Sequence, residues 1–102
     1  MKYIVMVRKV GGMTREVPVL FPSELVHRHV ADALLKLPGN PYGFENRVAA
    51  AGDVTLGIGT VECGGRSSTL NIGSRGEADE RLIEMCEYGA GVKAQAAGDL
   101  VT

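Results

Sequence analysis

Residues 63–80 read C-G-G-R-S-S-T-L-N-I-G-S-R-G-E-A-D-E. A glycine pair, a short apolar run and a serine ahead of acidic residues predict a turn, a strand and a capped helix in that order. Ser74 and Glu77 have the spacing of a capping box. A smaller version of the pattern occurs earlier, where Gly11-Gly12 precedes a strand and Ser23 opens another helix. The two halves therefore share a rhythm, although they do not share a sequence.

The rest of the chain extends this pattern into a complete fold. Residues 2–10 are apolar on both faces, which indicates an interior strand or one whose second face is covered. Pro18 lacks an amide hydrogen and places the strand over 15–21 at a sheet edge or a bulge. The remaining segments predict three further strands and two helices, over 47–56, 60–63, 68–72, 23–37 and 74–89. We therefore expect an α+β two-layer sandwich, with an antiparallel sheet of four to five strands and two helices on one face (ββα–ββ(β)α).

Apolar spacing also predicts which side of each helix faces the core. The first helix has apolar residues at Val26, Val30, Ala33, Leu34 and Leu37, with Leu35 on its polar side. The second helix has an expected inner stripe of Ala78, Leu82, Met85 and Cys86. Residues 1–89 are expected to form one domain, and the weakly patterned residues 90–102 a flexible or weakly ordered C-terminal tail.

Composition narrows the class of protein. The chain of 102 residues is 45% hydrophobic and has a net charge of −1, so it lacks the basic field expected of a nucleic-acid-binding protein. It has no apolar run of membrane-spanning length. Residues 1–50 carry +3 and residues 51–102 carry −4, an asymmetry that suits self-association or a charged partner. Leu35 on the polar side of the first helix, the two-sided first strand and the edge strand with Pro18 together favour a homodimer or small oligomer.

The reactive side chains do not form a recognisable catalytic motif. His27 and His29 diverge on a helix and have no third metal ligand at suitable spacing. Cys63 and Cys86 have no export signal ahead of them, so we expect reduced thiols and a cytoplasmic protein. Neither cysteine has the surroundings of a thiol enzyme. The sequence therefore predicts no catalytic residue, no metal site and no cofactor.

The glycine-rich stretch contains the best candidates for binding a small anion. Glycine turns and helix N-termini present free amides, and arginines add bidentate contacts to phosphate or carboxylate. The candidate residues are Arg66, Ser67, Ser68 and Arg75. The alternative is that the glycines only make turns and Ser74 only caps a helix. A phosphate-binding loop of the G-x-x-x-x-G-K-[ST] type is not present.

An acidic strip on the second helix is the competing candidate. At 100° per residue, four glutamates fall on one outer face: Glu77, Glu80, Glu84 and Glu87. Such a strip suits a basic protein partner, or it is simply a solvated helix face.

Residues 21–35 (F-P-S-E-L-V-H-R-H-V-A-D-A-L-L) and 68–83 (S-T-L-N-I-G-S-R-G-E-A-D-E-R-L-I) resemble short accessory proteins encoded by phages and prophages. The resemblance covers about a third of the chain and brings no catalytic motif. It implies a protein of the bacterial host cytoplasm that binds a host protein or sequesters a signalling nucleotide. The resulting prediction is a non-enzymatic binding protein for a host macromolecule, with a phosphate- or nucleotide-binding protein as the alternative.

Overall fold

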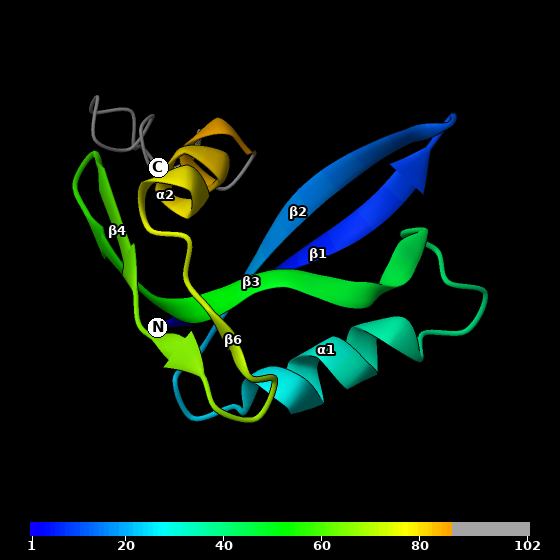
Figure 1. Ribbon diagram of the computed structural model, residues 1–102, viewed down its shortest axis with the longest axis horizontal. Helices are drawn as coiled ribbons and strands as arrows, with labels where there is room; N and C mark the ends of the chain where they lie inside the picture. The colour runs from blue at the N-terminus through cyan, green and yellow to red at the C-terminus, as the bar shows by residue number, and fades with distance from the viewer. Residues whose placement is uncertain (87–102) are drawn as a thin grey trace, which may run out of the picture.

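The computed structural model describes residues 1–86 of the chain (Figure 1). The predictions for Glu87 and for residues 90–102 lie outside the described residues. The elements follow one another in the order β1 Lys2–Val10, β2 Met13–Phe21, α1 His27–Leu35, β3 Phe44–Gly57, β4 Thr60–Gly64, β5 Arg66–Ser67, β6 Ile72–Gly73 and α2 Glu77–Met85.

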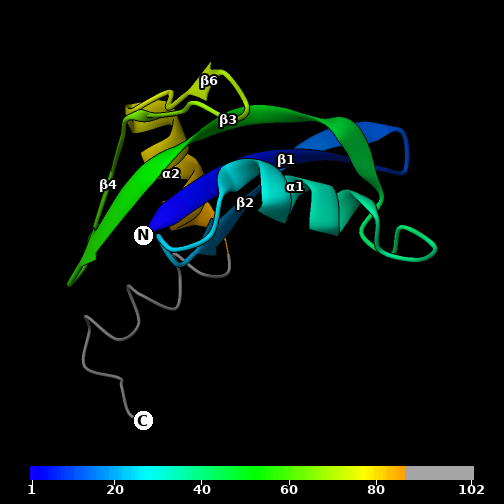
Figure 2. The ribbon, with the colours of Figure 1, turned by 90° about the horizontal axis from the view of Figure 1, so that it is seen from below.

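Four strands form an antiparallel sheet with the order β2-β1-β3-β4. The sheet is strongly curved, and α1 runs along one side of it (Figure 2). The predicted α+β class with an antiparallel sheet is confirmed, as are the interior position of β1 and the edge position of the Pro18-containing strand β2. The first strand has the predicted bounds, because the Gly11-Gly12 turn, with positive φ at both glycines, fixes where the hairpin reverses.

The two helices cover opposite faces of the sheet. Tyr3 and Val5 pack in one cluster with Ile83 of α2. Ile4 and Met6 pack in a second cluster with Ala31 of α1. Figure 1 shows the helices on either side of β3. The expectation that both helices share one face is therefore wrong, and the reason is that both faces of β1 are apolar and each needs a cover.

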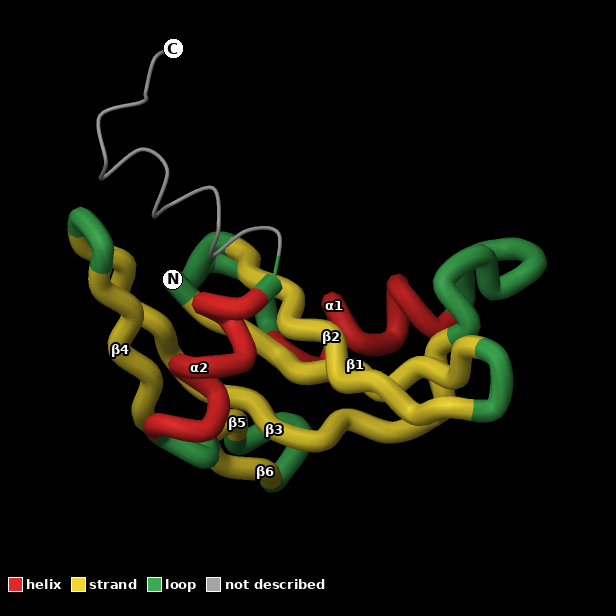
Figure 3. The backbone as a smooth tube through the Cα atoms, turned by 90° about the horizontal axis from the view of Figure 1, so that it is seen from above, coloured by secondary structure: helices red, strands yellow, loops and turns green. Residues whose placement is uncertain are grey.

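The predicted strand over 68–72 is replaced by a small separate hairpin, which Figure 3 shows beside β3. Only Arg66–Ser67 and Ile72–Gly73 pair, with Ser67 opposite Ile72. Asn71 has a φ of 56°, a conformation that asparagine tolerates in turns but that does not continue a strand. Leu70 and Ile72 still pack against the core, on the side of the sheet that α1 covers.

Both helices begin later than the capping signals predict. Helix α1 has Val26 at its N-cap and no side-chain cap, because the amide of Leu25 donates to Pro22 O at 3.1 Å and holds Ser23 in a turn. Helix α2 has Gly76 at its N-cap. Ser74 instead accepts the Gly76 amide at 3.0 Å. The prediction that Ser23 and Ser74 are N-caps is therefore wrong.

The buried sides of the helices are rotated from the predicted stripes. Ala33, Leu37, Ala78 and Met85 are exposed, whereas Leu35 packs against the core. The residues buried on α1 are His27 and Ala31, and those on α2 are Asp79 and Ile83. Polar residues at the centre of each buried face explain the error, because hydrophobic spacing assigns such positions to solvent.

Candidate functional site

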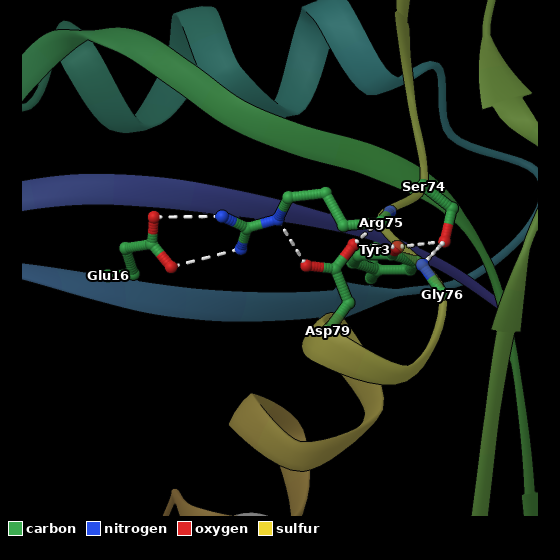
Figure 4. A network of polar contacts seen from close by, with 6 residues as sticks. All are labelled: Tyr3, Glu16, Ser74, Arg75, Gly76 and Asp79. Atoms are coloured by element: carbon green, nitrogen blue, oxygen red, sulfur yellow. Dashed lines mark hydrogen bonds and ion pairs between the residues drawn. The ribbon is translucent and has the colours of Figure 1, made fainter.

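A buried carboxylate organises the start of α2. The Asp79 side chain is fully buried and faces the sheet from the first turn of the helix (Figure 4). It accepts hydrogen bonds from the Tyr3 hydroxyl, from the Arg75 amide at 2.8 Å and from Arg75 Nε at 2.7 Å. An acidic residue in this turn also faces the positive end of the helix dipole. The carboxylate is thus fully partnered despite its burial.

Tyr3 connects this carboxylate to Ser74. The Tyr3 hydroxyl lies 2.7 Å from Ser74 Oγ and also contacts Asp79. A phenol has one proton, and a carboxylate oxygen accepts, so Tyr3 donates to Asp79 and its oxygen accepts a hydrogen bond from the Ser74 hydroxyl. Burial and donation to Asp79 raise the pKa of Tyr3 well above its usual value. The phenol therefore remains neutral and serves as a fixed donor.

Arg75 bridges two carboxylates. Its two terminal nitrogens donate to the Glu16 carboxylate at 2.9 and 3.0 Å, and its Nε donates to Asp79. Hydrogen bonds to Glu16, and to a smaller extent those to Asp79, raise the pKa of the Arg75 guanidinium above its usual value. The bidentate pair joins the edge strand β2 to the start of α2. The predicted anion-binding role of Arg75 would require an anion to compete with both carboxylates.

The other predicted anion-binding residues also have local partners. The Arg66 guanidinium donates to Asn71 Oδ1 across the small hairpin. Ser67 is fully buried, and its Oγ accepts the amide of Leu70 at 3.1 Å. Ser68 is exposed. Arg66 and Ser67 thus have a structural role in the turn of the small hairpin. The predicted anion site at Arg66, Ser67, Ser68 and Arg75 remains an untested prediction that the geometry does not favour.

The acidic strip is divided by the fold. Glu80 turns toward β4, where its carboxylate accepts the amide of Cys63 at 2.9 Å. Glu77 points outward with a side chain that is 80% exposed, at 3.8 Å from Arg81. Glu84, seven residues after Glu77, lies on the same side of the helix and is half-buried. Of the four predicted partner-binding glutamates, the structure thus places Glu77 and Glu84 together on the outer face.

Cys63 is held as a neutral thiol. Burial, with the charges of Asp79 and Glu80 nearby, raises the pKa of Cys63 to about 11. Nucleophilic cysteines need the opposite environment, in which a cation or a helix N-terminus favours the thiolate. Both cysteines are unpaired.

His27, on the buried face of α1, also has a structural role. His27 Nε2 lies 2.9 Å from Gly52 O, and its ring meets the ring of Phe21 edge-on at 5.5 Å between centroids. Within residues 1–86, no three His, Cys, Asp or Glu side chains come together as metal ligands would.

A groove that no sequence pattern predicted opens between β2 and the flank of α2. Its volume is about 320 Å³. Its walls are formed by Arg8, Arg15, Glu16, Val17, Pro18, Leu82, Met85 and Cys86. Of the contacts described so far, only Tyr3 carried a usable signal: a tyrosine inside a buried strand needs a polar partner. Asp79 is one of five acidic residues between positions 77 and 87. The sequence alone therefore does not show which of the five is the partner of Tyr3.

Comparisons with protein-family models, with curated proteins and with solved structures found no match to this chain. Within the described residues, none of the helices has the length and apolar character needed to cross a bilayer.

Proposed function

We propose that this protein is a non-enzymatic binding protein that acts by contacting a protein partner in the cell that makes it. Its reactive groups support this proposal, because each has a structural task. Cys63 is kept protonated, His27 contacts a backbone carbonyl, and Asp79 is paired with Arg75 inside the core. The resemblance of residues 21–35 and 68–83 to small phage-encoded proteins agrees with a host protein as that partner.

The observation that carries the proposal is the outer face of α2. Glu77 and Glu84 lie on this face, with the Glu77 side chain 80% exposed, and Glu80, which lies between them along the helix, is held by the Cys63 amide of β4. A helix anchored in this way presents its outer carboxylates at fixed positions. Fixed negative charges steer association with a basic surface and orient the partner.

Charge reversal on this face tests the proposal. Glu77→Lys/Glu84→Lys is compared with Glu24→Lys/Glu62→Lys, which makes the same charge change at two exposed positions outside α2. Each tagged protein is incubated with a bacterial lysate, and bound proteins are quantified by mass spectrometry. We expect a protein captured by the wild type and the control to be lost with the α2 variant. Equal capture by all three proteins, with unchanged thermal unfolding, would refute the proposal.

A further inference from the structure

The groove between β2 and α2 holds two arginines with no acidic partner. Arg8 and Arg15 stand directly opposite each other on neighbouring strands, and both line the groove. None of the ion pairs within residues 1–86 includes either guanidinium. Like charges in directly opposite positions destabilise a sheet. This arrangement therefore leaves a local electrostatic cost that a bound anion would remove.

The Arg8 side chain shows the same need for an acceptor. Its Nε atom is buried and has no hydrogen-bond partner among residues 1–86. A buried donor without an acceptor is costly and rare in folded proteins. Glu16, the acidic residue in the groove wall, does not meet this need, because its two oxygens accept from Arg75. The groove thus presents two guanidinium groups that no carboxylate of residues 1–86 neutralises.

The remaining wall of the groove is apolar. Val17 and Pro18 contribute it from β2, and Leu82 and Met85 from α2. Met85 is 84% exposed and lies at the rim of the groove. The volume of about 320 Å³ is at the small end of the range for ligand sites, roughly 300–1,000 Å³.

The edge of β2 favours a compact ligand over an added strand. Pro18 lies in the middle of this edge strand and has no amide hydrogen to donate. An extended peptide or a second copy of the sheet would therefore lose a ladder hydrogen bond here. A ligand in the groove must be held by side chains instead.

From these observations we propose that the groove binds a small amphiphilic anion. A carboxylate or phosphate head would lie between Arg8 and Arg15, since guanidinium groups pair with either head in bidentate fashion. A short apolar body would cover Val17, Leu82 and Met85. This site replaces the Arg66–Arg75 region as the candidate for small-ligand binding, and it does not depend on the proposed contact of Glu77 and Glu84 with a protein.

Titration of the full chain tests the site, with calorimetry and thermal unfolding as readouts. The probes are hexanoate and hexyl phosphate, which distinguish the two head groups, with 1-hexanol and inorganic phosphate as half-ligands. We expect saturable binding of at least one six-carbon anion, at least tenfold tighter than either half-ligand, and a rise in Tm with ligand concentration. Absence of binding by both anions, or equal binding of 1-hexanol, would overturn the inference.

Variants locate the binding. Arg15→Gln should weaken the anion at least tenfold, whereas Arg47→Gln, which removes an exposed arginine on β3, should leave binding unchanged. Met85→Ser at the exposed rim should weaken hexyl phosphate and leave inorganic phosphate unaffected. Retained affinity in Arg15→Gln would exclude the groove. Because these assays use the isolated protein, they can fail while the α2 variant still loses its protein partner, and the reverse also holds.

Discussion

Replacement of Tyr3 by phenylalanine measures what the buried polar network contributes. The substitution keeps the ring in the core and removes the hydroxyl that contacts Asp79 and Ser74. Asp79 retains two donors from Arg75, at 2.7 and 2.8 Å. The loss is therefore the hydrogen bond to the Asp79 carboxylate, worth about 1.5–3 kcal/mol, together with the weaker one to Ser74. With total stabilities of about 5–15 kcal/mol for natural domains, this is a large share.

The assay is urea unfolding followed by circular dichroism, with thermal unfolding in parallel. We expect Tyr3→Phe to lose about 2 kcal/mol with an unchanged m-value, and to lower Tm by about 10 °C. Tyr42→Phe is the matched control, since Tyr42 is half exposed and should change stability by less than about 0.5 kcal/mol. A Tyr3→Phe variant as stable as this control would refute the reasoning, because it would show that the hydroxyl only repays the cost of its own burial.

Three further perturbations test the network and its surroundings. The pKa of Cys63 is raised to about 11, so its neutral thiol contributes stability that is present up to about pH 9 and lost as pH approaches 11. Between pH 8 and 11, the Tm of the wild type should therefore fall more steeply than that of Cys63→Ala. Equal slopes for the two proteins would contradict this prediction. Gly52→Ala should lower the free energy of unfolding by about 2 kcal/mol or more, because the added Cβ would lie 2.4 Å from Gly64 O. Gly64→Ala is the control, since a Cβ there meets no neighbour within 4 Å. Equal urea midpoints for the two variants would contradict this prediction. Arg75→Met should lower the free energy of unfolding in urea by about 3 kcal/mol, whereas Arg81→Met, at an exposed ion pair, should lower it by less than about 0.5 kcal/mol. An Arg75→Met variant with wild-type stability would show that the guanidinium is free to bind a ligand.

Local signals in the sequence predicted the sheet better than the helices. The Gly11-Gly12 turn and the apolar residues on both faces of 2–10 predicted the first hairpin, and Pro18 predicted the edge position of its second strand. These signals succeed because turn geometry and a missing amide act within a few residues. The predicted helix starts were wrong because Ser23 lies in a turn and Ser74 contacts Tyr3, so neither serine caps a helix.

The candidate sites were harder to predict, because they depend on contacts between distant segments. Arg75 meets Glu16 across 59 positions of sequence, and Tyr3 meets Asp79 across 76. Spacing within a segment carries no information on such pairs. The Arg8–Arg15 pair is different: the hairpin turn fixes its register, so a correct hairpin already places these two arginines opposite each other.

The polar network also explains how such a short helix keeps its place. Helix α2 has nine residues, and Ile83 is its only fully buried apolar side chain within the described chain. Burial of one isoleucine contributes about 1.5–3 kcal/mol and does not by itself select one orientation of a helix on a curved sheet. Asp79, Arg75 and Glu80 supply the directional contacts, to β1, β2 and β4 respectively. Because α2 forms one wall of the groove, these contacts also set the distance between Met85 and the two arginines. A variant that breaks the network without unfolding the domain should therefore alter anion binding from outside the groove.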